Sequence, residues 1–415
     1  MKSKIYVLLA IVLVASLVLT FGCAPKEAAP AAPAAPIKIG CIQDITGLVT
    51  TGGSDIKTAA KVSIEQLGPV EGHAWEDIWR DSAWKTSLGV SHAEELCTSE
   101  KVDLLLSPIS SAVRLGISGV AKKYGVIMFD TVAGSDSLYM ENGHKYFFEL
   151  GICCKAEAYS QANLCATLFP DAKTIVTIAP DYVWGRDEVK YFKEWLKVLC
   201  PEKTVIKEYW PELQTPDYSS YITSIMADKP DILETILYAA DNIGFFKQFA
   251  AQDPWDKMYI NAFFEGSSRK PNAALFPPGV VGGYARCPIL SIDTPVAKKF
   301  VMDFHNSPLS NGAYPAHVET YTYDALWIYR QAVEEANGSL DDEILVPIIQ
   351  GGTFDTLRGK AGFIPYCNVL KCPTYNGLWG WRTDYENGVL DPLHALDLSE
   401  VYPTKAEVEA ARAAK

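Results

Sequence analysis

"VDLLLSPISSAVRLGISGVAKKYGVIMFD", residues 102–130, decides the fold class, because it carries two apolar runs separated by a helical pattern. The runs at 102–106 and 125–130 are short and mostly apolar, which is typical of strands buried on both faces. Between them Val113, Ile117 and Val120 fall on one face of a helix. The stretch therefore predicts a β-α-β unit within a parallel sheet.

The same alternation continues on both sides of this unit. Further strands are expected at 37–42, 173–181, 204–210, 231–239, 257–264 and 279–287, and helices at 187–199, 217–229 and 316–337. There are more of these strand-helix units than a single sheet would hold. We therefore expect an α/β fold of two doubly wound, Rossmann-like lobes. Near the C-terminus, 359–366 and 377–390 are β-like, and Asn387-Gly388 is expected to form a hairpin turn.

The N-terminus predicts export. Lys2 and Lys4 precede an uncharged apolar run, 5–21, which makes residues 1–22 a signal peptide; an uncleaved membrane anchor is the alternative. The stretch "LTFGC" resembles a bacterial lipoprotein box, in which Cys23 would carry the lipid; a free cysteine is the alternative. Residues 23–36 are rich in Ala and Pro and would form an extended tether. The expected location is extracytoplasmic, anchored to the membrane by lipid.

Composition and motifs argue against several classes of function. The net charge of −13 disfavours a nucleic-acid partner. Ten cysteines less Cys23 leave nine, so at least one is unpaired within the chain, while Cys367 and Cys372 could close a small loop. The adjacent Cys153 and Cys154 lack a metal-site spacing, and structural thiols are the simpler interpretation. With no hydrolase, Walker or dinucleotide motif, neither an enzyme nor a cofactor or metal is expected.

Several stretches in order resemble one family. "IKIGCIQDITGLVTTGG" (37–53), "LLLSPISSA" (104–112), "TIAPDYVWGRDEVKYFKEW" (177–195), "PDILETILYAADNIGFFKQF" (230–249), "FFEG" (263–266) and "YTYDALWIYRQAVEEA" (321–336) resemble the solute-binding proteins of ABC transporters that bind leucine, isoleucine and valine. The resemblance extends over residues 37–382. It implies the type I periplasmic binding protein fold, with ligand held between two lobes.

The resemblance also implies three crossovers, near residues 153–158, near Arg286 and near residues 355–359. The first lobe would comprise 37–154 and 287–356, and the second 155–286 and 357–400. Residues 401–415 would form a C-terminal helical tail.

Candidate ligand-binding residues follow the predicted strand ends. In the first lobe, Ser110 and Ser111 precede a helix, whose positive end favours an anion. Ser111 matches the family serine that contacts the ligand carboxylate, whereas simple helix capping is the alternative.

In the second lobe, Glu265 matches the glutamate that meets the ligand ammonium, with a solvated loop residue as the alternative. Tyr238 matches a tyrosine that closes over the ligand; a half-buried strand aromatic is the alternative. Tyr182 and Trp184 either stack on the ligand or shape the lobe.

The chain departs from the family pattern in the pocket floor, where Val132 is also a candidate. Gly134, with Ser135 beside it, stands where the family threonine binds both ends of an amino acid. Cys154 replaces an aspartate and Gly52 an aromatic residue. These departures predict a roomier, less polar pocket.

The expected function is capture of a small solute and its delivery to an ABC transporter permease by a monomeric receptor. Branched-chain or other amino acids, related amides and carboxylates, and aromatic acids all remain open. A sensor of the same fold, reporting to a signalling partner, is the alternative to uptake.

Overall fold

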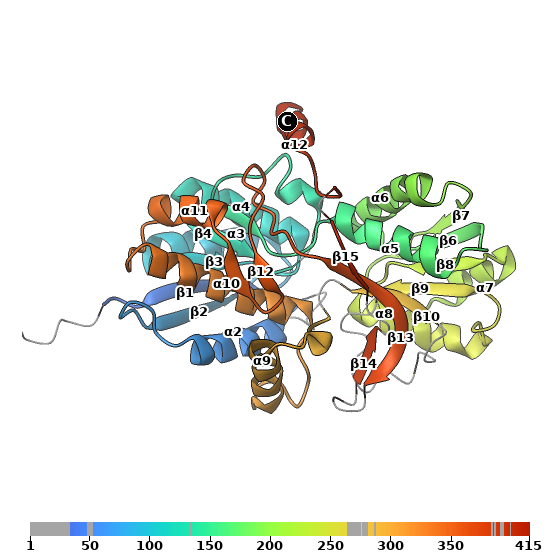
Figure 1. Ribbon diagram of the computed structural model, residues 1–415, viewed down its shortest axis with the longest axis horizontal. Coiled ribbons are helices and arrows are strands. Elements are labelled where there is room, and N and C mark those ends of the chain that lie inside the picture. Colours follow the sequence, from blue (N-terminus) through green and yellow to red (C-terminus); the bar gives the residue numbers. More distant parts are fainter. Residues whose placement is uncertain are drawn as a thin grey trace, which may run out of the picture. The chain divides into compact units, whose positions relative to one another are not determined.

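The quoted β-α-β unit lies at the centre of the first of the two large sheets (Figure 1). The computed structural model describes residues 34–47, 53–132, 134–263, 275, 281–285, 288–382, 385, 387–390, 394–398 and 400–415. The chain divides into Met1–Ala35 and Pro36–Lys415, and both sheets belong to the second unit. All the pairings of the first sheet are parallel, in the order β2-β1-β3-β4-β5. Its strands are β1 (Ile37–Gln43), β2 (Trp75–Asp81), β3 (Leu104–Leu106), β4 (Ile127–Asp130) and β5 (Phe147–Glu149).

Helices cover both faces of this sheet. Successive side chains of a strand point to opposite faces, so Leu104 and Leu106 enter one apolar cluster and Leu105 enters another. The first cluster also takes residues from α2 (Gly53–Leu67), α9 (Pro295–Asn306), α10 (His317–Glu335) and α11 (Asp342–Gly351). The second takes residues from α3 (Thr86–Glu95) and α4 (Ser111–Tyr124). The predicted doubly wound arrangement is therefore present.

The second sheet has the order β14-β13-β10-β9-β8-β6-β7, with β15 also paired to β13. Its parallel part is β6 (Thr174–Ile178), β7 (Thr204–Tyr209), β8 (Ile232–Thr235), β9 (Tyr259–Phe263) and β10 (Val281–Ala285). Its antiparallel part is β13 (Thr374–Arg382), β14 (Asn387–Leu390) and β15 (His394–Leu396). One face contacts α5 (Cys154–Leu168) and α6 (Val183–Leu199), and the other contacts α7 (Ser219–Asp228) and α8 (Ala239–Phe249). We call the two sheets with their helices the first and second lobes.

Two of the connections between the lobes lie side by side. The chain leaves the first sheet after β5, and the N–H of Glu149 donates to the carbonyl of Asn368 at 2.9 Å. In return the N–H of Leu370 donates to the carbonyl of Glu149 at 2.8 Å. The expected crossover at Arg286 lies outside the described residues.

Residues after Thr356, which the sequence analysis assigned to the second lobe, contribute to the first lobe as far as Leu370. The first of these residues form β12 (Gly359–Ala361), which pairs antiparallel with the preceding strand β11 (Phe354–Thr356) in a hairpin. A buried ion pair fixes this hairpin to α10, because Arg358 Nε lies 3.0 Å from Asp324 Oδ2 and both side chains are inaccessible to solvent. The chain therefore crosses to β13 only after Leu370.

Three local expectations differ from the structure. The edge strand β2, "WEDIWRD", was not predicted, because it has four charged residues among its seven and stays partly exposed. Asn387 and Gly388 lie within β14, opposite Arg382 and Trp381, and not at the hairpin turn. All cysteines of the described part are free, Cys367 and Cys372 included; both are buried in one apolar cluster, and the Tyr402 hydroxyl holds the Cys372 backbone.

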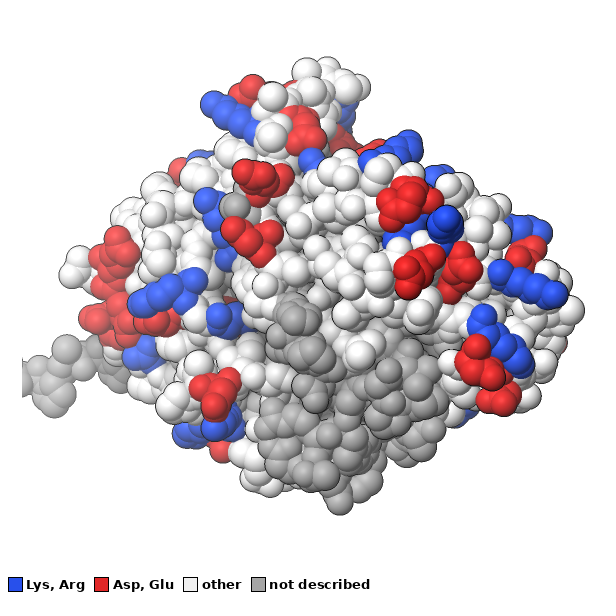
Figure 2. All heavy atoms as spheres, turned by 45° about the vertical axis from the view of Figure 1, so that its right-hand side comes forward, with Lys and Arg blue, Asp and Glu red and all other residues white. Residues whose placement is uncertain are grey.

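The C-terminal segment returns to the first lobe. Val401, Tyr402 and Val408 join its second apolar cluster, and helix α12 spans Lys405–Ala413. Arg412 Nε of this helix donates to the carbonyl of Met140 at 3.1 Å. On the face drawn in Figure 2, acidic and basic side chains are interspersed. No helix in the described ranges is long and apolar enough to cross a membrane.

Candidate ligand-binding site

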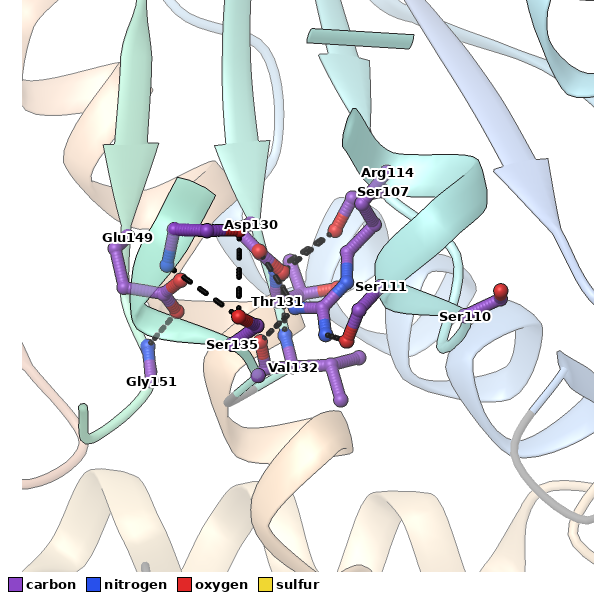
Figure 3. A network of polar contacts seen from close by, with 12 residues as sticks. Ser107, Ser110, Ser111, Arg114, Asp130, Thr131, Val132, Ser135, Glu149 and Gly151 are labelled. Atoms are coloured by element: carbon purple, nitrogen blue, oxygen red, sulfur yellow. Dashed lines mark hydrogen bonds and ion pairs between the residues drawn. The ribbon is translucent and has the colours of Figure 1, made fainter. Parts of the chain in front are cut away.

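The carboxyl ends of the parallel strands in each lobe carry the polar and aromatic side chains that the sequence analysis singled out. In the first lobe, Ser110 and Ser111 follow β3, Gly134 and Ser135 follow β4, and Cys154 follows β5. Ligands of open α/β sheets bind at this edge. The carboxyl edge of the first sheet is therefore the candidate ligand-binding edge of the first lobe, and Figure 3 shows it.

The two serines before α4 play different structural parts. Ser110 is the N-cap: its hydroxyl accepts from the Val113 N–H at 3.5 Å, and its own N–H donates to Asp44 Oδ2 at 2.9 Å. Ser111 is the first residue of the helix, and its hydroxyl accepts from Arg114 Nη2 at 3.1 Å. Figure 3 shows the Ser111 hydroxyl turned toward the guanidinium, while the Ser110 side chain points away. Capping thus accounts for Ser110, and the Ser111 hydroxyl remains the candidate contact.

Arg114 is a candidate site residue that the sequence analysis did not single out. Its guanidinium lies beneath α4, where Nη1 is 2.6 Å from Asp130 Oδ2, and the two side chains are 1% and 0% exposed. The helical spacing of the sequence could have indicated that Arg114 is buried, because it shares a helix face with Ile117, Ser118 and Ala121, all of which are buried. An arginine on the buried face of a helix needs an acidic partner.

Two acidic residues share the surroundings of this guanidinium. Oδ1 of Asp130 accepts from the Ser107 hydroxyl at 2.8 Å and from the Val132 N–H at 3.0 Å. Burial, and then the charge of Asp130, raise the pKa of Glu149 well above its usual range, against the opposing charge of Arg114. Glu149 is therefore more easily protonated than a free carboxyl, and the direct ion pair of Arg114 is with Asp130.

Gly134 and Ser135 form hydrogen bonds that join the carboxyl edge of the first sheet to α5 and α6. The carbonyl of Gly134 accepts from the Cys154 thiol at 3.2 Å, and burial raises the pKa of that thiol well above its usual range. The Ser135 hydroxyl donates to Asp187 Oδ2 at 2.9 Å. Asp187 belongs to α6, so this hydrogen bond joins the two lobes.

The candidate residues of the second lobe form an aromatic group. Trp184 lies in the first turn of α6 and Tyr238 just before α8, with ring centroids 6.5 Å apart. Tyr182 lies 6.1 Å from Trp184. Phe263, the last residue of β9, stacks on Tyr238 at 5.8 Å and was not singled out from the sequence. Phe263 could have been identified from the sequence by its position at a strand end, as Tyr238 was.

The aromatic group also meets the first lobe. The ring of His317, at the start of α10, lies 6.4 Å from Tyr238 and 6.2 Å from Phe263. Together with the hydrogen bond between Ser135 and Asp187, these contacts bring the carboxyl edges of the two sheets face to face. The pair of edges offers hydrogen-bond donors on one side and flat apolar surfaces on the other.

Three predicted residues cannot be placed. Glu265, Gly52 and Cys23 lie outside the described residues. Within the described ranges, no cluster of three histidine, cysteine or acidic side chains could hold a metal ion. Val132 is buried beside Ile56, Ile109 and Val318 in a small apolar cluster.

Two comparisons complete the description. The model of the family described as periplasmic binding protein matches residues 36–375. A solute-binding protein of an ABC transporter from Rhodopseudomonas palustris BisB5, in complex with 3,4-dihydroxybenzoic acid, is similar with a TM-score of 0.79 and 20% identity, over 87% of this chain and 97% of that one.

Two further structures are similar over comparable lengths. An amino acid ABC transporter substrate-binding protein from Pseudomonas fluorescens Pf-5 has a TM-score of 0.79 and 16% identity, over 91% of this chain and 99% of that one. An ABC-type branched-chain amino acid transporter from Rhodopseudomonas palustris CGA009 has a TM-score of 0.71 and 23% identity, over 89% and 99%. At these identities the similarity shows the two-lobed fold.

Proposed function

The chain belongs to the periplasmic binding protein family, and from this membership we propose that it captures a small solute between its lobes and delivers it to an ABC importer. The observation that carries the proposal is the meeting of the two carboxyl edges, through Ser135 and Asp187 and through the His317 ring. A solute that contacts both edges would stabilise the closed arrangement of the lobes. A permease could then distinguish loaded from empty protein.

The solute is proposed to be an amino acid or a related small carboxylate or amide. Ser111 would donate its hydroxyl and its backbone N–H to the carboxylate, at the positive end of the α4 dipole. Tyr238 and Trp184 would cover the apolar part of the solute. Glu265 would meet an ammonium group where the solute carries one. The similar proteins named above include a dihydroxybenzoic acid complex and an amino acid transporter component, so both solute classes are consistent with the fold.

The remaining first-lobe candidates would form the pocket floor. Val132, Gly134 and Ser135 follow one strand, and Cys154 begins α5 across from them. Because the Cys154 thiol donates to the Gly134 carbonyl, the two segments are held together beneath the site. We assign these residues to the shape of the floor, and Ser135 also to lobe closure.

The protein is proposed to act outside the cytoplasm, tethered by a lipid on Cys23 and without catalytic turnover. Replacing Cys23 by alanine should move the protein from the membrane fraction to the soluble fraction after cell lysis. Unchanged sedimentation with membranes would contradict the lipid anchor. Mass spectrometry of the solute before and after incubation should show it unaltered, and conversion to a product would instead indicate an enzyme.

A thermal-shift screen tests the binding function. Amino acids, amides and aliphatic and aromatic carboxylates would each be added to the purified protein, and a solute at 100 times its dissociation constant should add about 2.7 kcal/mol of stability. Ser111→Ala should weaken binding of any carboxylate found. Ser224→Ala, on α7 in the second lobe, is the matched control and should bind normally. The absence of any stabilising solute in a broad screen would refute the proposed function.

A further inference from the structure

Arg114 occupies the space that a side chain at position 134 would need. A Cβ built on Gly134 would lie 1.9 Å from Arg114 Nη2 and 2.6 Å from its Cζ, closer than atoms can approach. The backbone of Gly134 is not in the left-handed region, so glycine is not required there for its conformation. The absence of a side chain at Gly134 instead leaves room for the guanidinium. By resemblance this is the position of the family threonine, so a different functional group fills the floor here.

The guanidinium brings only hydrogen-bond donors to this place. Arginine has five N–H donors and no acceptor. Three bonds to described residues are made: Nη1 donates to Asp130 Oδ2 and to the Val132 carbonyl, and Nη2 donates to Ser111 Oγ. Among the described residues Nε of Arg114 finds no acceptor, although the side chain is 99% buried. A buried donor without a partner favours an added acceptor at this site.

Arg114 also determines what Ser111 can do. Because the Ser111 oxygen accepts from Nη2, its own hydroxyl proton is free to turn toward a ligand. The carbonyl oxygens of Val132 and Gly134 each already accept one hydrogen bond, from Arg114 and from Cys154 respectively. The floor therefore offers donors from Ser111, Arg114 and the N-terminus of the 14-residue helix α4.

We propose that this donor-rich floor selects a carboxylate that has no ammonium on its α-carbon and whose apolar body packs on the rings of Tyr182, Trp184 and Tyr238. The inference rests on the proposed function and narrows its solute class. The α-ammonium of an amino acid lies one carbon from the carboxylate, so it would face the guanidinium and the positive end of α4. A neutral amide would bring an NH2 donor toward these donors.

Matched probes test this selectivity. Isothermal titration calorimetry would compare 3-phenylpropanoate with L-phenylalanine and 3-phenylpropanamide, and 4-methylpentanoate with L-leucine. We expect each des-amino carboxylate to bind at least about 10-fold more tightly than its amino acid or amide partner, since a hydrogen bond to a charged group contributes that much or more.

Gly134→Ala tests the role of Arg114 without removing its charge. The added methyl group forces the guanidinium to move, so carboxylate affinity should fall about 10-fold while amide affinity changes less. Gly119→Ala is the matched control, because a Cβ at Gly119 meets nothing within 4 Å; its affinities should equal those of the parent. If Gly134→Ala does not fold, as judged by circular dichroism, Ser111→Ala replaces it with the same expectation.

The possible outcomes distinguish the proposed carboxylate selectivity from the proposed solute-binding function on which it rests. Equal or tighter binding of L-phenylalanine or L-leucine overturns the inference and leaves the binding function intact. Binding of only some other solute class in the broad screen also overturns it. A Gly134→Ala protein with unchanged selectivity refutes the role of Arg114, and the absence of binding to any solute refutes both proposals.

Discussion

Replacing Arg114 by methionine would remove the cation of the buried pair beneath α4 and leave the apolar stem in place. In the parent, Arg114 Nη1 lies 2.6 Å from Asp130 Oδ2, with the side chains 1% and 0% exposed. The variant leaves the Asp130 carboxylate buried without its cation. Breaking a buried pair in this way costs about 3–5 kcal/mol of unfolding free energy.

The remaining hydrogen bonds place the expected loss at the lower end of that range. Asp130 keeps the Ser107 hydroxyl at 2.8 Å and the Val132 N–H at 3.0 Å. We therefore expect Arg114→Met to lose about 3 kcal/mol at pH 7.

Urea unfolding followed by tryptophan fluorescence would measure this loss. The double variant Arg114→Met with Asp130→Asn should recover most of the stability, because it buries no unpaired charge. Lys193→Met is a surface control: its pair with Glu208 has a similar N–O distance of 2.6 Å but side chains 45% and 29% exposed, so it should lose less than about 1 kcal/mol. A loss below about 1 kcal/mol for Arg114→Met, or a double variant no more stable than the single one, would refute the reasoning.

Three further outcomes are expected. Trp184→Ala, at a side chain 97% buried, should lower the unfolding free energy by about 3–5 kcal/mol in urea unfolding, and an unchanged midpoint would contradict its place in the core. Ser135→Ala removes the hydrogen bond to Asp187, so small-angle scattering should show a more open protein without solute; an identical scattering curve would exclude a role in closure. Burial raises the pKa of Asp136 to about 6, so the stability that protonated Asp136 contributes should be lost as pH rises from about 4 through 6. Asp136→Asn should flatten that part of the stability profile, whereas a parallel profile would assign the change to other groups.

Much of the fold follows from short-range patterns. Leu104, Leu105 and Leu106 are apolar without interruption because both faces of their strand are covered, and the helix after them shows its buried face every three to four residues. The unpredicted strand β2 is the instructive exception. At the sheet edge its side chains stay partly exposed, so burial imposed no apolar pattern on it.

The candidate site shows the limit of such patterns. Ser111 and Tyr238 could be located because they follow strands, and strand ends can be found from sequence. The contact between Arg114 and Gly134 could not be predicted from the sequence. The two residues are 20 positions apart and meet only through the packing of α4 on β4.

The sequence by itself determined the α/β class and the strand ends, while the family came from the resemblance of several motifs in order. The class and the strand ends depend on local periodicity and burial, which each segment carries independently of its neighbours. Only the tertiary structure decided that Ser111 bonds to a buried arginine, that Ser135 meets Asp187, and that residues 357–370 stay with the first lobe. Such partners depend on side-chain directions across packed elements, which the order of residues along the chain does not specify.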